Sequence, residues 1–239
     1  MTNPAHLPNP PSEPPPIPGA PPLGTSFGEI LEALLKRPAS LMQHICTAKS
    51  SRSWLLLALA AVTAFTLYGL LIGTFSGGAQ LLAAPLKVAG GMILSALICF
   101  PSLYIFMALT GMEISLRALA GVLFAMLALT GLLLLGFAPI AWVFSQSTES
   151  AGFVGALYLA IWGTATALGL RLLTMTVGPR RMAHLVVWEI IFVMVALQMT
   201  TALRPIVGVA PDWLPKEKKF FMSYWADNLL KSEPKPRSE

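Results

Sequence analysis

The sequence predicts an all-α fold: a polytopic integral membrane helical bundle of about five transmembrane helices, preceded by amphipathic N-terminal helices. Of the 239 residues, 55% are hydrophobic and 11% are charged, whereas soluble domains carry about 25% charged residues. The mean hydropathy of +0.70 indicates a chain whose solvent is partly lipid. Long apolar runs fill the middle of the chain. These observations argue against a cytoplasmic globular enzyme.

Residues 1–24 form a proline-rich segment that holds ten of the twenty prolines. Proline fixes the backbone φ angle and removes a hydrogen-bond donor, so the segment favours solvated polyproline II over a packed core. We expect a disordered tail. The alternative is a docking peptide for an aromatic groove of a partner.

Residues 25–52 predict short amphipathic helices. Ser26-x-x-Glu29 has the form of a capping box, apolar residues recur at helical spacing from Phe27 to Leu35, and Pro38 ends that helix or begins another. Basic residues lie between the apolar ones: Lys36, Arg37, His44, Lys49 and Arg52. Such helices either lie at the membrane surface or pack on the cytoplasmic ends of the spans.

The transmembrane bundle is predicted over residues 53–204. A helix needs about 20 apolar residues to cross a hydrocarbon core of roughly 30 Å. The runs that meet this requirement are 54–75, 88–110, 118–144, 152–175 and 185–203. Pro101 lies inside the second run and is expected to kink it. The third run is long enough to tilt or to leave the membrane before Pro139.

The basic residues near the predicted spans place the N-terminus in the cytoplasm. That orientation puts eight of them inside: Lys36, Arg37, Lys49, Arg52, Arg117, Arg171, Arg180 and Arg181. The outside loops then carry Lys87 alone as a basic residue. Five crossings place the basic C-terminal tail outside, and an even number would place it inside, so the side of the tail stays open.

The C-terminal tail, residues 205–239, contains the aromatic cluster 220–225 directly after the lysine-rich stretch 216–219. Aromatic side chains beside lysines are typical of a helix at the headgroup level of a membrane. We therefore expect an interfacial segment here, followed by nine disordered residues. A nucleic-acid site would need a larger basic surface.

Arg171 and Glu189 are the charged residues within the last two predicted spans. Arg171 lies about five residues before the fourth predicted span ends, and Glu189 lies about five residues after the fifth begins, which places both roughly 6–8 Å below the same membrane interface. We expect them to pair across the hairpin or to snorkel separately. A structural lock between two helices is the leading interpretation, and a proton or ion gate in a transporter is the alternative.

Small residues recur every three or four positions along the fourth predicted span. They are Gly152, Ala156, Ala160, Gly163 and Ala167, and Arg171 continues their line. Small residues let helices approach closely in lipid. The stripe therefore predicts helix packing, either within the bundle or between protomers.

No catalytic, cofactor or metal site is predicted. The two cysteines, Cys46 and Cys99, and the three scattered histidines make neither a disulfide framework nor a metal-ligand cluster. No zinc-protease motif, nucleophile elbow or Walker-type glycine loop is present. We expect a protein that is not an enzyme and that does not bind nucleic acid.

Two resemblances follow from the sequence. The proline-rich N-terminus, the amphipathic lead-in and the five clustered spans resemble the Yip1-like family of membrane proteins. Residues 111–118 are similar to that family's Gly/Ser-x-Arg connection, and residues 134–139 to its Leu-Gly/Pro run. In eukaryotes this family is implicated in vesicle trafficking, a role that no residue of this chain specifically supports.

The second resemblance lies at the exit from the last span, residues 198–205. It is similar to a Gln…Trp-x-Leu-Arg-Pro-Phe signature of uncharacterised bacterial polytopic membrane proteins, although Ala202 and Ile206 depart from that pattern. It implies a bacterial inner-membrane location and a structured membrane exit at Arg204 and Pro205. Proline independently predicts the end of the helix there.

The function predicted is a non-enzymatic membrane scaffold or anchor. Its expected partners are the lipid bilayer and protein partners of unknown identity, and a homo-oligomer is a further option. The alternative is a small transporter or permease subunit with a gate formed by Arg171 and Glu189.

Overall fold

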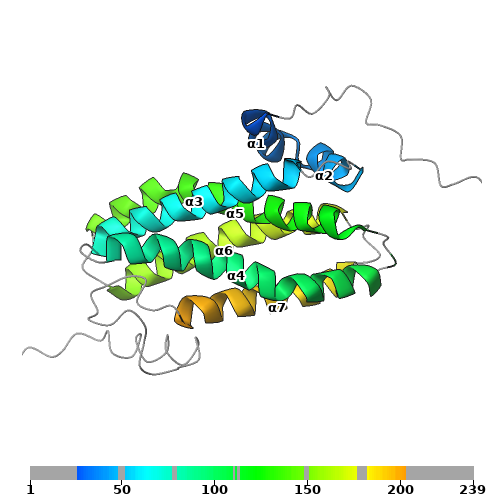
Figure 1. The fold of residues 1–239 in the computed structure, drawn as a ribbon. Helices are drawn as coiled ribbons and strands as arrows, with labels where there is room; N and C mark the ends of the chain where they lie inside the picture. The colour runs from blue at the N-terminus through cyan, green and yellow to red at the C-terminus, as the bar shows by residue number, and fades with distance from the viewer. Residues whose placement is uncertain are drawn as a thin grey trace, which may run out of the picture.

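The computed structural model describes residues 26–47, 52–76, 80–109, 111, 114–147, 151–176 and 182–202, and this part of the chain contains seven α-helices and no strand. The all-α prediction is therefore confirmed (Figure 1). The helices are α1 (Phe27–Lys36), α2 (Pro38–Thr47), α3 (Arg52–Ser76), α4 (Gln80–Leu109), α5 (Leu116–Ser147), α6 (Ala151–Thr176) and α7 (Met182–Ala202).

Within the described residues, four helices are long and apolar enough to cross a membrane, which supports a membrane protein with transmembrane helices. Their apolar stretches are Arg52–Gly73 in α3, Leu81–Leu109 in α4, Leu116–Phe144 in α5 and Gly155–Thr176 in α6. The corresponding stretch of α7, Ala183–Met199, is shorter. The fifth predicted span is thus a helix, and its crossing of the membrane stays a prediction.

Helix α4 begins eight residues before the span predicted from residue 88, and this corrects the placement of Lys87 in an outside loop. Pro85 and Lys87 interrupt the apolar run, yet both lie within the helix. Packing explains why the helix continues through Pro85. Gly69 of α3 lies close to the backbone of α4, and a Cβ placed on it would be 2.5 Å from the Cα of Pro85. Pro101 also lies within the unbroken helix.

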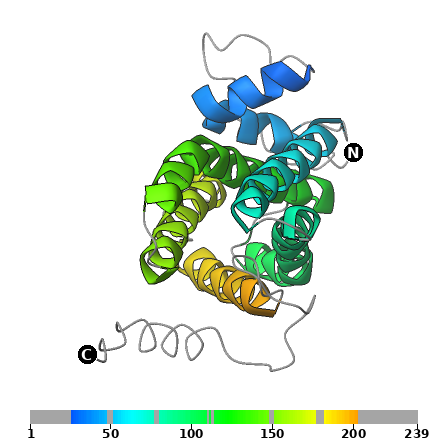
Figure 2. The same ribbon diagram turned by 90° about the vertical axis from the view of Figure 1, so that its left-hand side faces the viewer.

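The five long helices are arranged in a ring whose order is α7, α4, α3, α5, α6 (Figure 2). Helix α3 has extensive contacts with α4 and α5, α5 packs on α6, and α4 packs on α7. Helices α6 and α7 follow one another in the chain but contact each other only slightly. Consecutive helices alternate in direction, so the two ends of the bundle collect residues from different parts of the sequence.

The α1–α2 hairpin packs on the flank of the bundle near the end where α3 and α5 begin (Figures 1 and 2). The Glu29 carboxylate accepts a hydrogen bond from the Ser26 N–H at 3.0 Å, as the capping box predicts. The side chains that face the bundle are buried: Ile30, Ala33, Leu34, Leu41, Met42 and Ile45. Of the two placements left open by the sequence, packing on the spans is therefore present.

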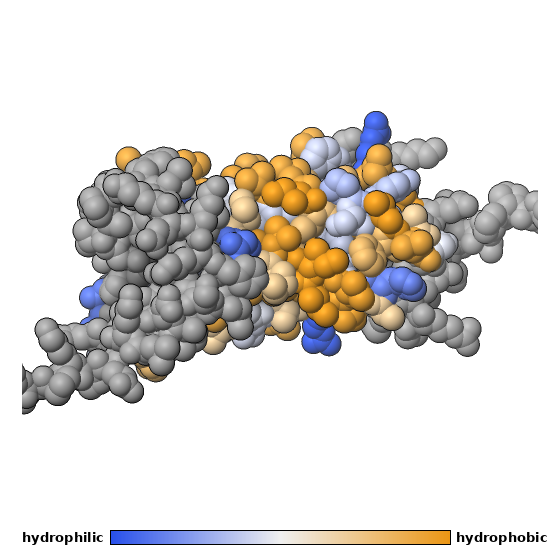
Figure 3. All heavy atoms as spheres, turned by 90° about the horizontal axis from the view of Figure 1, so that it is seen from below, coloured by the Kyte–Doolittle hydropathy of each residue, from blue (hydrophilic) through white to orange (hydrophobic). Residues whose placement is uncertain are grey.

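A single cluster of buried apolar side chains runs from the hairpin through all five long helices. Its largest fully buried members include Phe65, Leu103, Leu127, Trp188 and Phe192. The exterior is apolar too, as the middle of the face in Figure 3 shows. On α7 the exposed side chains include Val186, Val187, Ile190, Ile191 and Met194. An apolar surface of this extent is that of a helix bundle solvated by lipid.

Several predictions concern residues outside the described part of the chain. These are the proline-rich tail at 1–24, the C-terminal tail at 205–239 with its aromatic segment, and the membrane exit at Arg204 and Pro205.

Candidate functional site

The predicted ion pair between Arg171 and Glu189 is not formed. Arg171 of α6 is exposed, and Glu189 of α7 is partly buried. The Oε1 atom of Glu189 is buried without a hydrogen-bond partner in the described structure. Helix position predicted correctly that both residues lie toward the same end of the bundle. The weak contact between α6 and α7 is the physical reason that they do not pair.

Trp188 directs α7 toward α4 rather than toward α6. Its side chain is fully buried, and its indole Nε1 donates to the carbonyl oxygen of Cys99, 3.1 Å away. The same Nε1 lies 3.1 Å from Oγ of Ser102. The ring also stacks on Phe192, with centroids 5.4 Å apart. A buried indole requires an acceptor, so this contact fixes which face of α7 meets α4.

The sequence analysis did not identify the Trp188 contact. The only signal available was a tryptophan inside an apolar helix, which needs one acceptor in an environment without water. The sequence does not state which helix supplies that acceptor. Ser102 follows Pro101 and donates its own hydroxyl to the Cys99 carbonyl at 2.8 Å, so two donors meet at one carbonyl beside the proline.

The predicted small-residue stripe of α6 faces outward. Ala156, Ala160 and Ala167 are exposed, and a Cβ placed on Gly163 would meet no heavy atom within 4 Å. The surroundings of Gly152 lie outside the described side chains. The stripe therefore does not pack α6 against its neighbours within the described bundle. Packing between protomers stays a prediction.

The close approach of α6 to the bundle uses a different face, at Gly169. A Cβ there would collide with Oγ1 of Thr130 and lie 3.0 Å from the carbonyl oxygen of Met126, both in α5. Gly131 of α5 meets α3 in the same way, because its Cβ would lie 2.8 Å from that of Ala64. Small residues thus bring three helices together, as expected in lipid, on faces that the spacing rule did not select.

Few polar side chains are buried in the described bundle, and two of them bond within their own helix. The hydroxyl of Ser95 donates to the Gly91 carbonyl at 2.7 Å, and that of Thr130 to the Met126 carbonyl at 2.9 Å. Such bonds satisfy a hydroxyl without joining helices. Thr166 differs, because its buried Oγ1 has no partner in the described structure.

Lys87 is the buried cation that the sequence analysis misplaced. It is 5% exposed and lies six residues after Leu81, where the apolar stretch of α4 begins. That stretch has 29 residues, so it is about 43 Å long and exceeds the roughly 30 Å hydrocarbon core. Lys87 therefore lies near the headgroup boundary at the end of the bundle opposite Arg171.

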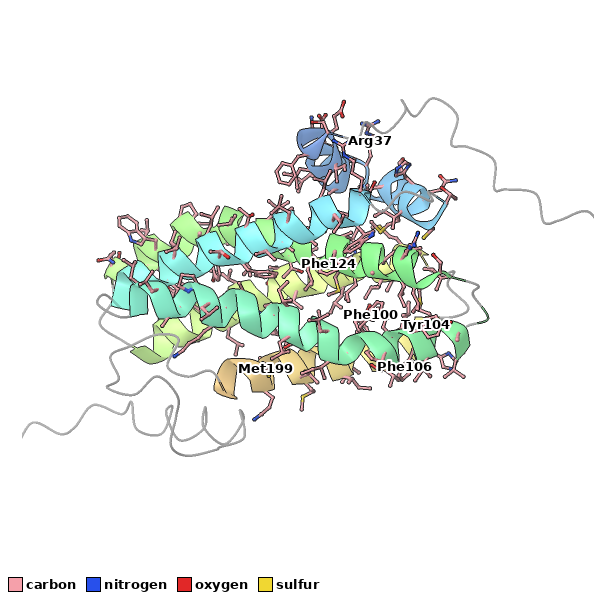
Figure 4. All side chains as sticks on the ribbon, in the orientation of Figure 1. Arg37, Phe100, Tyr104, Phe106, Phe124 and Met199 are labelled. Atoms are coloured by element: carbon pink, nitrogen blue, oxygen red, sulfur yellow. The ribbon has the colours of Figure 1, made fainter. Side chains whose placement is uncertain are left out.

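Apart from Lys87, the described lysines and arginines lie at the end of the bundle that carries the α1–α2 hairpin. Arg52 begins α3, Arg117 begins α5 and Arg171 lies near the end of α6. Lys36 and Arg37 belong to the hairpin, and Figure 4 shows Arg37 on its side away from the bundle. This excess of basic residues at one end of the bundle is the feature from which the sequence analysis assigned the N-terminal side to the cytoplasm. No group of three or more histidine, cysteine or acidic residues in the described chain is placed to hold a metal ion.

Comparison of the chain with protein-family models, with curated proteins and with solved structures found no match. The resemblances to the Yip1-like family and to the bacterial polytopic proteins therefore stay predictions.

Proposed function

We propose that this chain is a non-enzymatic membrane scaffold or anchor. The observation that carries the proposal is the continuous apolar cluster that joins the α1–α2 hairpin to all five long helices. A transport route needs polar groups along the interior, whereas the buried hydroxyls of Ser95 and Thr130 bond to their own helices. A continuous apolar core with the hairpin packed on it supports a holding role.

The proposed topology has five spans and a cytoplasmic N-terminus. Helix α7 has 21 residues, a length of about 31 Å that matches the hydrocarbon core. It packs along α4 through Trp188 and Phe192, which supports its crossing the membrane beside α4. The cations at the hairpin end support a cytoplasmic location of that end. A bacterial inner membrane is proposed from the sequence resemblance alone.

The proposed partners are the bilayer, other proteins at the cytoplasmic end, and a second copy of the chain. The polar side of α1, with Glu29, Glu32 and Lys36, is exposed to solvent. The outward small residues of α6, including Ala156 and Ala160, offer a surface on which another helix can pack closely.

Site-specific photo-crosslinking in native membranes tests the scaffold role. With Cys46→Ser and Cys99→Ala as background, a photoactivatable group is attached at Glu32→Cys, on the polar side of α1, or at Leu97→Cys, exposed on α4. A scaffold predicts defined protein adducts from position 32 and none of those adducts from position 97. Absence of adducts from position 32, together with ion flux in vesicles that contain the purified chain, would contradict the proposal.

A small permease subunit is the second candidate, and one observation favours it. Oε1 of Glu189 is buried in an apolar helix without a hydrogen-bond partner in the described structure. Buried carboxyls without partners are costly and are found where protons or ions bind. Glu189→Gln distinguishes the candidates, because it abolishes flux in a permease and leaves the adducts of a scaffold unchanged.

A further inference from the structure

Helix α1 has three distinct faces rather than the two of an ordinary amphipathic helix. The first is formed by Ile30, Ala33 and Leu34, which are buried against the bundle. The second is formed by Phe27, Leu31 and Leu35, which recur every fourth residue and so share one side of the helix. Phe27 is 40% and Leu35 57% exposed, and Leu31 between them is partly buried.

The third face of α1 is polar and lies opposite the first two. It carries Glu29, Glu32 and Lys36, and the Lys36 Nζ lies 3.2 Å from the Glu32 carboxylate. At about 100° per residue these positions occupy the sector that remains after the buried and the apolar exposed faces. A helix with bundle on one side and water on every other side has no need for the second, apolar face.

The position of the hairpin explains what covers that apolar face. Ile45 of α2 packs closely on Gly121 of α5. A Cβ placed on Gly121 would lie 2.5 Å from Cγ2 of Ile45. Gly121 lies five residues into α5, about 7.5 Å below the start of the helix. Trp54 and Phe124 stack at the same level, with ring centroids 6.0 Å apart. The hairpin therefore lies beside the first turns of the spans, at the level of the headgroup boundary.

The apolar face of α1 belongs to a helix that packs against a span whose own exposed side chains are apolar. Helix α1 contacts α3, and α3 exposes Leu55 and Leu59 over 52% and 56% of their areas. These side chains lie in the first two turns of a span, where acyl chains are the solvent. A neighbouring apolar face at the same level meets the same solvent.

We propose that α1 inserts Phe27, Leu31 and Leu35 into the headgroup–acyl boundary of the cytoplasmic leaflet. Its three faces then meet bundle, lipid and water, and only the polar face remains for protein partners. In-plane helices with this amphipathic pattern lie about 5–10 Å into the boundary. The inference concerns the lipid contact of α1 and does not depend on the scaffold role, which the crosslinking at position 32 tests separately.

Spin-label accessibility in the full chain tests the proposal. A nitroxide is attached singly at Phe27→Cys, Leu35→Cys, Glu29→Cys or Glu32→Cys in the Cys46→Ser, Cys99→Ala background, and the protein is reconstituted in phosphatidylethanolamine–phosphatidylglycerol vesicles. We expect labels at 27 and 35 to collide more with oxygen, which partitions into lipid, than with a water-soluble nickel chelate. We expect the reverse at 29 and 32. Leu59→Cys is the lipid-exposed reference.

Two results would overturn the proposal. Greater nickel than oxygen accessibility at positions 27 and 35 would place the face in water. Low accessibility to both reagents at these positions would mean that protein covers it, either another segment of the chain or a second copy. Normal values at Leu59→Cys show in each case that the bundle is correctly inserted.

Discussion

The indole Nε1 of Trp188 donates to the backbone carbonyl of Cys99 across 3.1 Å, and this bond between residues 89 positions apart in the sequence joins α7 to α4. In a membrane interior no water competes for that donor or for that acceptor. The bond therefore selects α4 as the partner of α7 and leaves Glu189, the next residue, beside this contact rather than beside Arg171.

Replacing Trp188 by phenylalanine should loosen α7 from α4. The variant retains an aromatic ring but loses the donor and part of the buried volume, so we expect a loss of roughly 1–2 kcal/mol in the free energy of unfolding. Thermal unfolding in mild detergent measures it. Trp142→Phe is the matched control, because Trp142 is 48% exposed. Equal effects of both substitutions would mean that the Trp188 contact does not hold the helix.

A methyl group at Gly69 should disrupt the contact between α3 and α4. Gly69→Ala forces the backbone around Pro85 to move, and overpacking of this kind destabilises by about 1–3 kcal/mol. Gly136→Ala adds the same group where no atom lies within 4 Å. Both variants receive the same gain in helix propensity, so the difference between their unfolding midpoints isolates the steric conflict. An unchanged or higher midpoint for Gly69→Ala would contradict this packing.

Arg171 and Glu189 should act independently. Because they do not pair, the effects of Arg171→Gln and Glu189→Gln on stability should add, with a coupling energy below about 0.5 kcal/mol. Glu189→Gln should not destabilise the bundle, because it removes a buried carboxyl without a partner at Oε1. A double-mutant cycle measured by unfolding in detergent checks both statements. A coupling energy well above that value, or recovery of stability by a charge swap, would show that the two residues form an ion pair and would contradict the prediction.

Labelling of the native cysteines should report the orientation of the hairpin. Cys46 of α2 is exposed and Cys99 is buried. A membrane-impermeant maleimide should therefore modify Cys46 alone, and only from the cytoplasmic side. Cys46→Ser should abolish the signal. Labelling of intact cells or spheroplasts from outside would reverse the proposed topology.

The pH dependence of that reaction follows from the environment of the thiol. Although Cys46 is exposed as a residue, partial desolvation of its thiol raises the pKa of Cys46 above its ordinary value, so at neutral pH less thiolate is present than in a free cysteine, whose pKa is about 8.5. The thiolate is the reactive form. The labelling rate at pH 7 should thus be lower than that of a free thiol and should continue to rise at pH values where the free thiol has reached its plateau.

The sequence predicts the helices well because hydrophobicity and length decide them. The predicted run 118–144 lies within α5, and 152–175 lies within α6. The predicted start of the second span, residue 88, was too late because Pro85 and Lys87 break the apolar run. The close contact of Pro85 with Gly69 is a tertiary contact, so a local sequence pattern does not reveal it.

The candidate site was less predictable than the fold. The positions of Arg171 and Glu189 along their helices place both near one end of the bundle. Which neighbouring helix each face contacts depends on tertiary packing, which the local sequence does not encode. In α6 the small residues Ala156 and Ala160 follow the expected spacing and face outward, whereas Gly169 makes the close contact with α5. A stripe of small residues permits the close approach of another helix without specifying which helix that is.

Alkaline carbonate extraction of membranes, followed by high-speed centrifugation, tests the central claim most directly. The account predicts that the untagged chain remains in the membrane pellet and enters the supernatant only after detergent is added, because the exposed surfaces of α3 to α6 are apolar along stretches of at least 22 residues. Recovery of the folded chain in the detergent-free supernatant would contradict it.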